Sequence, residues 1–204
     1  MTTPYHALTP RLELRCYEPR DAQALIDAMA DGTDHLLPWM AWAQEEPQPI
    51  EEKIALLRTF RGRFDLDQDW IFGAFERGRP DVLVGGTGLH PRVGPGAAEI
   101  GYWVRRGRQG AGIATELASA MTRLGFECQT WSRIEIHCDA RNVPSARIAR
   151  KLGYREEGRL RGRSVAVGGG DQLVFGMLAG EYPASPAAAL AVMAFDAVGG
   201  RILG

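Results

Sequence analysis

Glycines and arginines gather in the stretch 105–112, directly after a run of β-branched and aromatic residues that is typical of a strand. Glycine permits a tight turn whose amides face outward, since no Cβ stands in the way. From Ile113 onward, apolar residues recur at helical spacing. A helix that begins there leaves its first N–H groups without partners at the positive end of its dipole, which favours phosphate binding. Together with Arg105, Arg106 and Arg108, this turn predicts a site for an anionic, phosphate-bearing ligand.

The order of the glycines narrows the choice of ligand. They read G-x-x-G-x-G late in the chain, whereas a dinucleotide fingerprint reads G-x-G-x-x-G near the start of a βαβ unit. The Gly-Lys-Ser/Thr ending of a P-loop is absent as well. These two phosphate-binding motifs are therefore excluded. A plain strand–turn–helix whose glycines serve only close packing remains the alternative.

A second strand and helix follow downstream. Segment 134–139 alternates like a strand, and the loop after it contains Pro144, a residue that suits a helix start. Asn142 and Ser145 flank this proline, and Gly153 is expected just beyond the end of the helix. Both polar residues have a purely structural alternative, because Ser caps helix starts and Asn forms turns before proline.

Taken in order, these motifs resemble the Gcn5-related N-acetyltransferase (GNAT) family. The opening and closing segments resemble its RimJ/RimL-type branch, which acetylates protein N-termini. The resemblance extends from about Arg11 to Leu178. The segments that carry it are Thr9–Arg15, Glu99–Trp103, the glycine turn, Asn142-x-x-Ser145, Lys151–Tyr154 and Asp171–Leu178.

The resemblance implies an α/β fold of mixed α+β type. We expect a mostly antiparallel, twisted sheet of about six to seven strands, splayed between the fourth and fifth, with about four flanking helices. With 204 residues and 45% hydrophobic content, the chain suits one domain with a sizeable core. We expect the GNAT domain to span residues 1–180. Residues 181–204 are then an extension that packs on the domain or on a partner subunit, which makes a homodimer plausible.

The resemblance also implies acetyl-CoA as the co-substrate, with its pyrophosphate on the glycine turn. No residue spacing suggests a metal ion. Asn142 suits the pantetheine amides. The residues expected to hold acetyl-CoA are Trp103, Val104, Arg106, Gln109, Gly110, Ala111, Gly112, Ile113, Ala114, Thr115, Asn142 and Ser145.

Direct transfer of an acetyl group to an amine needs a donor for the developing oxyanion and a proton for the departing thiolate. In the family, a backbone N–H near the end of the fourth strand serves the oxyanion. Here that group belongs to Val104 or to Trp103. Many relatives protonate the thiolate with a tyrosine, but Ala149 occupies that position. RimJ/RimL-type relatives use a serine, which corresponds to Ser145.

The general base is open at this stage. Glu99 on the fourth strand is one candidate, and His90 and His137 are rivals because imidazole titrates near neutral pH. A glutamate used by RimJ/RimL relatives falls near Ser164 in this chain. Water is also sufficient for an α-amino group, whose reference pKa is about 7.7–8.0. The structural alternative for Glu99 is that it is an exposed carboxylate at the end of a strand and has no catalytic role.

The acceptor site is predicted in the loop 35–49. Its Trp39 and Trp42 are expected to line a pocket for a small amine or a peptide end, with His90 near by, although core packing is the alternative for the indoles. We therefore expect acetyl transfer to a protein N-terminal α-amine. A small-molecule amine, a different acyl group such as succinyl, and a non-catalytic acyl-CoA sensor are the alternatives.

Composition limits the partners. The net charge of −1 gives no general attraction to nucleic acid or to a membrane surface. No apolar run is as long as a membrane span, and the first residues lack the apolar core of a signal peptide. Three cysteines without metal-ligand spacing indicate reduced thiols. These features predict a cytoplasmic enzyme.

Overall fold

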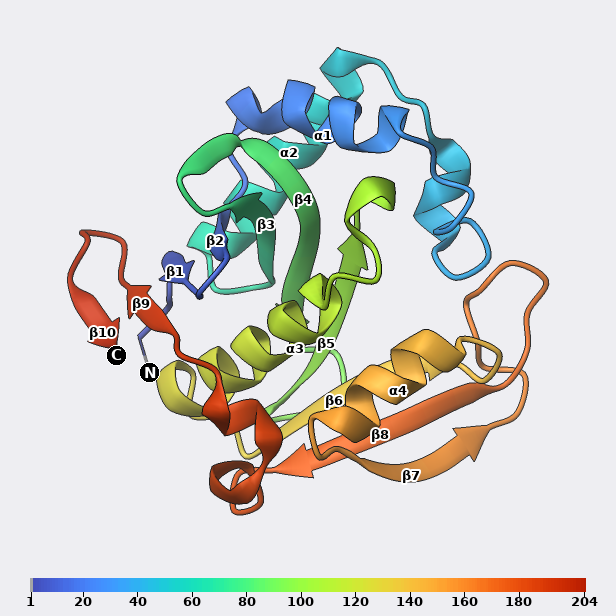
Figure 1. Ribbon diagram of the computed structural model, residues 1–204, viewed down its shortest axis with the longest axis vertical. Helices are drawn as coiled ribbons and strands as arrows, with labels where there is room; N and C mark the ends of the chain where they lie inside the picture. Colours follow the sequence, from blue (N-terminus) through green and yellow to red (C-terminus); the bar gives the residue numbers. More distant parts are fainter. Residues whose placement is uncertain (1) are drawn as a thin grey trace.

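One twisted sheet runs through the whole molecule. The computed structural model describes residues 2–204, and in this part of the chain ten strands pair in the order β10-β9-β1-β2-β3-β4-β5-β6-β8-β7 (Figure 1). All neighbours are antiparallel except β5 and β6. The strands are β1 (His6–Leu8), β2 (Leu12–Cys16), β3 (Trp70–Glu76), β4 (Arg79–His90), β5 (Ala97–Val104), β6 (Arg133–Asp139), β7 (Arg155–Leu160), β8 (Gln172–Leu178), β9 (Met193–Phe195) and β10 (Arg201–Leu203).

Four α-helices of the described chain flank this sheet, as expected. They are α1 (Ala22–Ala30), α2 (Ile50–Asp65), α3 (Ile113–Arg123) and α4 (Val143–Lys151). Short helical turns connect them: η1 (Pro19–Asp21), η2 (Ala41–Glu45), η3 (Arg106–Arg108), the π-turn η4 (Leu124–Cys128), η5 (Tyr182–Ala184) and η6 (Pro186–Ala189). None of the helices in residues 2–204 is both long and apolar enough to cross a bilayer.

The sheet opens between β5 and β6. These strands pair in parallel only from Ala97 to Glu99, opposite Arg133 to Glu135. Beyond Glu99 the two strands diverge, β5 toward α1 and β6 alongside α4 (Figure 1). They are the fourth and fifth strands of the predicted core, so the splay lies where it was expected. The sheet has more strands than predicted, because short strands at both ends of the chain extend its edge.

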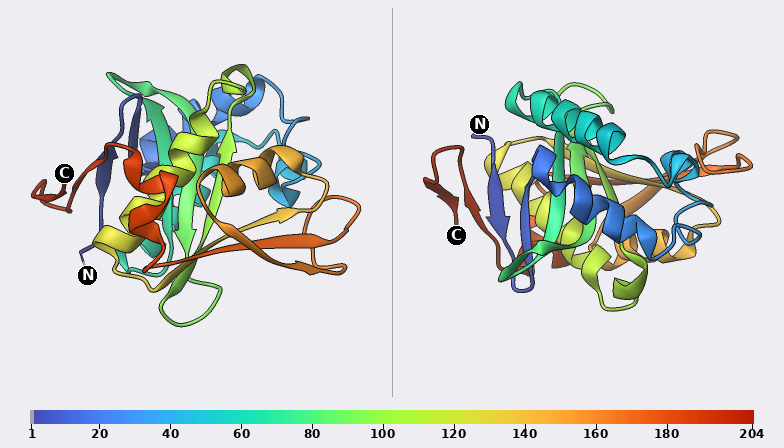
Figure 2. Two further views of the ribbon diagram at one scale, coloured as in Figure 1. Left: turned by 60° about the horizontal axis from the view of Figure 1, so that its bottom comes forward. Right: turned by 90° about the horizontal axis from the view of Figure 1, so that it is seen from above.

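Two groups of buried side chains lie on opposite faces of the sheet. One contains residues of α3 and α4, and the other contains residues of α1 and α2, which cover the sheet as Figure 2 shows. The alternation along β5 sends Ile100, Tyr102 and Val104 toward α3 and α4. Trp103 packs with the cluster of α1 and α2. The two faces of β5 therefore look into different environments.

Two details of these helices differ from what the sequence alone predicts. The helical spacing of Ile54, Leu57 and Phe60 predicts that all three face inward, but Ile54 is 36% exposed, whereas Lys53 is buried and forms an ion pair with Glu46. Asp21, placed after Pro19 at the start of a helix, is predicted to cap α1 with its side chain. Its carboxylate instead accepts from both terminal nitrogens of Arg15, at 2.7 and 2.8 Å, and from the Glu18 N–H at 2.7 Å. In both cases a charged partner outside the helix itself holds the side chain.

The segment 181–204 lies against the rest of the chain. β9 pairs with β1, and η6 contacts α3, where the Ser119 hydroxyl donates to the Ala187 carbonyl at 2.9 Å. Arg123 donates to the Leu190 carbonyl. Ala187, Val192 and Ala194 are buried by these contacts, whereas Val198 is 91% exposed.

Candidate active site

The glycine turn ends in a row of free amides. Within residues 2–204, the N–H groups from Gly110 to Thr115 donate to no protein acceptor, and the first bond of this region runs from the Glu116 N–H to the Gly112 carbonyl at 3.1 Å. Gly110 and Gly112 have φ of 73° and 79°, which L side chains rarely adopt. Residues 109–112 are exposed, so these amides are accessible at the positive end of α3.

A buried glutamate holds this turn in place. Glu116, on the first turn of α3, accepts from the Thr9 hydroxyl at 2.6 Å and from Nε of Arg11 at 2.6 Å. The same guanidinium donates to the Ala111 carbonyl at 2.7 Å. The turn between β1 and β2 thus anchors the peptide units that present the amides.

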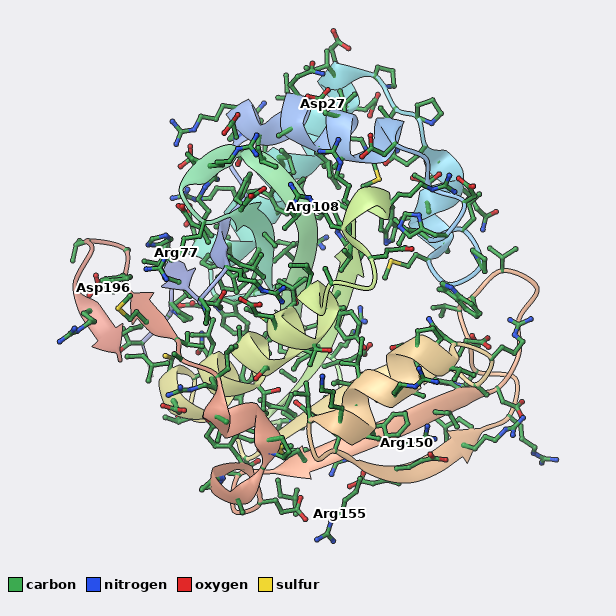
Figure 3. All side chains as sticks on the ribbon, in the orientation of Figure 1. Asp27, Arg77, Arg108, Arg150, Arg155 and Asp196 are labelled. Atoms are coloured by element: carbon green, nitrogen blue, oxygen red, sulfur yellow. The ribbon has the colours of Figure 1, made fainter. Side chains whose placement is uncertain are left out.

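The three arginines of the turn do not form the free cationic group that the sequence predicts. Arg105 pairs with Asp31, and Arg106 pairs with Asp34. Arg108, labelled in Figure 3, lies 2.7 Å from a carboxylate oxygen of Glu76. The exposed amides therefore carry most of the local attraction for phosphate. Arg106, expected to hold the cofactor, also joins the turn to the loop between α1 and α2.

Two backbone N–H groups of β5 point into the splay. The Arg105 N–H donates to the Val84 carbonyl of β4 at 2.9 Å. Since antiparallel bonding alternates along a strand, the Trp103 N–H also faces β4, whereas those of Tyr102 and Val104 face away from it. β6 pairs with β5 only as far as Glu99, so both groups look into the gap. Of the two predicted oxyanion donors, only Val104 has an amide with this direction.

A pair of hydroxyls lies across the same gap. The hydroxyl of Ser145, at the start of α4, is 2.8 Å from the phenol of Tyr102 on β5. Asn142 supplies the helix cap, since its side-chain oxygen accepts from the Ser145 N–H at 3.2 Å. The Ser145 hydroxyl is therefore free of the capping role. Burial raises the pKa of Tyr102 above its ordinary value, although the bond to Ser145 opposes this, so the phenol is neutral.

The opposite face of β5 carries aromatic and imidazole groups. Trp42 meets Trp103 edge to face, with ring centroids 6.0 Å apart. His90, on the neighbouring strand β4, lies on this face over Gly101. Trp39 is partly buried and makes no aromatic pair among the described residues. The structure thus brings Trp42 and His90 to one face of β5, beside Trp103.

Glu99 is held in an ion-pair network. Arg92 binds both its carboxylate oxygens at 2.7 Å. Burial by itself raises the pKa of Glu99, but the hydrogen bonds and charge of Arg92 outweigh it and hold that pKa below its usual value. His137 lies 3.6 Å from Glu99 and 2.5 Å from Glu135. A carboxylate held in this way is a weak proton acceptor.

The hydroxyl of Ser164, near which the resemblance placed the glutamate of RimJ/RimL relatives, donates to Asp139 at 2.6 Å. Arg141 binds the same carboxylate through its side chain at 2.8 and 2.9 Å. These hydrogen bonds hold the pKa of Asp139 far below its usual range. In residues 2–204, no group of three or more His, Cys, Asp or Glu side chains has the arrangement of a metal site.

Comparison with known proteins decides the family. Residues 11–155, well over half of the chain, match the acetyltransferase (GNAT) domain. The chain belongs to the GNAT acetyltransferase family. It is 29% identical to the uncharacterized N-acetyltransferase YnaD of Bacillus subtilis (strain 168), over 75% of this chain and 84% of that protein. It is 27% identical to the ribosomal-protein-serine acetyltransferase of Escherichia coli (strain K12), over 60% of this chain and 69% of that protein.

The fold of this GNAT acetyltransferase is shared with solved relatives. Mycobacterium smegmatis RimJ in complex with CoA-disulfide superposes with a TM-score of 0.77 at 28% identity, covering 89% of this chain and 91% of that one. GNAT acetyltransferases use acetyl-CoA, and the row of accessible amides from Gly110 to Thr115 fits the diphosphate of that co-substrate. When bound, acetyl-CoA supplies the thioester that acylates the amine.

Sequence reasoning missed three residues of this GNAT site. Tyr102 was passed over because an aromatic residue in a strand also fits the core. Asp69 and His35 lie in loops without periodic signals, yet Asp69 contacts His90, and Nε2 of His35 donates to the Val104 carbonyl at 2.9 Å. Their roles depend on contacts between distant segments, which no local pattern reveals.

Proposed function

We propose that this GNAT enzyme acetylates the α-amino group of a protein N-terminus. Acetyl-CoA lies on the side of α3 and α4, with its diphosphate on the amides after Gly110 and its sulfur near Ser145. The acceptor amine approaches from the other face of β5, past Trp42 and Trp103. Val104 donates its N–H to the oxyanion that develops on the carbonyl, and the Ser145 hydroxyl gives a proton to the departing sulfur.

The observation that carries the acceptor proposal is the open surface beside this face. A hollow of about 420 Å³ lies on the same side of the sheet as Glu99 and is lined by residues of β6, β7 and β8. Its lining residues are Val93, Glu135, His137, Glu157, Gly158, Leu160 and Val174. A hollow this open does not enclose a small amine, and it leaves room for a peptide that extends beyond Trp42 and Trp103. The ribosomal-protein-serine acetyltransferase among the relatives supports the same class of acceptor.

The basicity of an α-amine also supports a protein N-terminus as the acceptor. An α-amine has a reference pKa of about 7.7–8.0, against about 10.4 for a lysine side chain. A modest base is therefore sufficient to free an N-terminal amine, whereas lysine needs a stronger one. The carboxylates of Glu99 and Asp139 are both too acidic to supply strong basicity.

The test uses matched peptides. The substrates are peptides that begin with Ser, Ala or Met, each with a free or a blocked α-amine. Two kinds of control are included: a blocked peptide that contains an internal lysine, and a panel of small amines. Thiol release gives the rate, and mass spectrometry locates the acetyl group. We expect turnover of the free α-amine only. A small amine with a higher kcat/KM than every peptide would refute the proposal, and acetyl-CoA binding without thiol release would favour a sensor.

The same assay addresses the acyl group. Acetyl-CoA and succinyl-CoA are compared at equal concentration with the best peptide. We expect acetyl-CoA to be the better donor, because the Tyr102–Ser145 contact narrows the gap between β5 and α4. Faster transfer of succinyl would contradict this assignment.

A further inference from the structure

The imidazole of His90 packs against two glycines, Gly88 and Gly101, where a larger residue would crowd it. His90 ends β4 and lies over β5. A Cβ atom added at Gly88 or at Gly101 would stand 3.0 Å from Nε2 of its imidazole. The ring therefore rests on two backbone positions that carry no side chain. Gly101 directly precedes Tyr102, whose N–H looks into the gap.

Asp69 orients this imidazole. It lies just before β3, and its carboxylate is 2.6 Å from Nδ1 of His90. A carboxylate can only accept, so Nδ1 carries a proton and Nε2 of the neutral ring carries the lone pair. Nε2 has no protein hydrogen-bond partner among residues 2–204, and the His90 side chain is 17% exposed. The free nitrogen is thus both oriented and accessible.

The other basic groups of this face are engaged. Glu99 is bound by Arg92 through both oxygens. The two nitrogens of His137 face the carboxylates of Glu99 and Glu135. Together with Asp69, these are the charged and titratable groups around His90 in the described chain. Of the three bases weighed on this face, His90 alone presents, among the described residues, a nitrogen that faces no carboxylate within 4 Å.

We propose that His90 is the general base of the acetyl transfer and that Asp69 is its positioning residue. The proposal rests on the amine-acetyltransferase function but not on the identity of the amine. One N–H proton of the acceptor ammonium passes to Nε2 of His90, and the nitrogen lone pair so released forms the N–C bond with the thioester carbonyl. The C–S bond breaks, and the sulfur takes the proton of the Ser145 hydroxyl. The second proton leaving the nitrogen restores that hydroxyl through water, and His90 returns its proton to solvent.

The test measures kcat and KM against pH for His90→Ala and Asp69→Asn. The acceptor is the amine that the wild-type enzyme turns over best, so that a preference for small amines refutes the peptide proposal and leaves this test intact. We expect His90→Ala to lower kcat about 100-fold near neutral pH with an unchanged KM for acetyl-CoA. The deficit shrinks as pH rises, because the free amine then forms without a base. Added imidazole restores part of the rate.

Asp69→Asn separates positioning from catalysis. We expect kcat to fall about 10-fold with an unchanged KM for acetyl-CoA, because the imidazole keeps its nitrogen but loses the carboxylate that orients it. His6→Gln, a histidine on the remote strand β1 beside Glu13, serves as the matched control and leaves the profile unchanged.

Three results would overturn the proposal. They are a His90→Ala enzyme within threefold of wild type, a deficit that is the same at every pH, and a His137→Ala enzyme that alone loses the acidic limb. Thermal unfolding of each variant accompanies the kinetics. Gly101→Ala gives an independent check, since the added methyl group displaces the imidazole without removing it.

Discussion

Replacing Gly112 by alanine tests whether the conformation of the turn, and not only its charge, binds acetyl-CoA. Gly112 has a φ of 79° and forms the cap of α3. An alanine there meets nothing closer than a terminal nitrogen of Arg11 at 3.5 Å, so the change causes no steric clash. The backbone conformation alone is penalised, because a Cβ in the left-handed region costs about 1–2 kcal/mol.

This free-energy cost can lower either the stability of the protein or its affinity for CoA. If the turn keeps its conformation, the free energy of unfolding falls by the whole amount and the affinity for CoA stays. If the turn relaxes in the free protein, the amides are misdirected and binding must restore them. The affinity then falls by up to about 5- to 30-fold, since each 1.4 kcal/mol is tenfold. The two losses together should amount to about 1–2 kcal/mol.

Calorimetric titration with CoA and urea unfolding measure the two losses. Gly107→Ala is the matched control, because Gly107 lies in η3, has no positive φ and has nothing within 4 Å of an added Cβ. We expect that variant to bind CoA and to unfold like the wild type. A Gly112→Ala protein that matches Gly107→Ala in both measurements would refute the role assigned to the turn.

Three further outcomes follow from the described contacts. Ser145→Ala should lower kcat about 10- to 100-fold with little change in KM for acetyl-CoA. Adding Tyr102→Phe should lower kcat little more, because the two hydroxyls act as one unit. Steady-state kinetics of the single and double variants check this, and an unchanged kcat in Ser145→Ala would contradict it. The depressed pKa of Asp139 stabilises the fold above pH about 4, and this contribution is lost as the pH falls further. Asp139→Asn should therefore be less stable than wild type at pH 7 but lose less stability toward pH 2, as urea unfolding would show, and equal slopes for the two proteins would count against it. Lys53→Met should cost about 3–5 kcal/mol by leaving its buried carboxylate partner alone, whereas Lys151→Met on the exposed end of α4 should be neutral in the same assay.

The parts of the fold that the sequence predicted are those with a local cause. Gly153, expected just beyond α4, lies there with a φ of 90°. A helix end of this conformation favours glycine, because a residue without Cβ adopts it at low cost. The segment Asp171–Leu178, which resembles the closing segment of the family, contains β8 at Gln172–Leu178. The turn after β5 was predicted from its glycine spacing, and its amides are free as expected. In each case residues within one short segment carry the whole signal.

The parts that were wrong or missed depend on distant partners. Helical periodicity cannot separate Ile54 from Lys53 as the inward residue, because the two lie next to each other on one turn and the choice depends on Glu46. The charges of Arg105 and Arg106 were visible, but the acids that pair with them come from the loop after α1.

By itself, the sequence determined the family, the order of the main elements and the place of the phosphate-binding turn, because these follow from residue types and spacing along the chain. Only the tertiary structure decided the chemistry around β5. It placed the Tyr102 phenol against Ser145, and it placed Asp69 against His90, from segments 43 and 21 residues apart. Hydrogen bonds act over about 3 Å, and only folding brings such distant segments within that range.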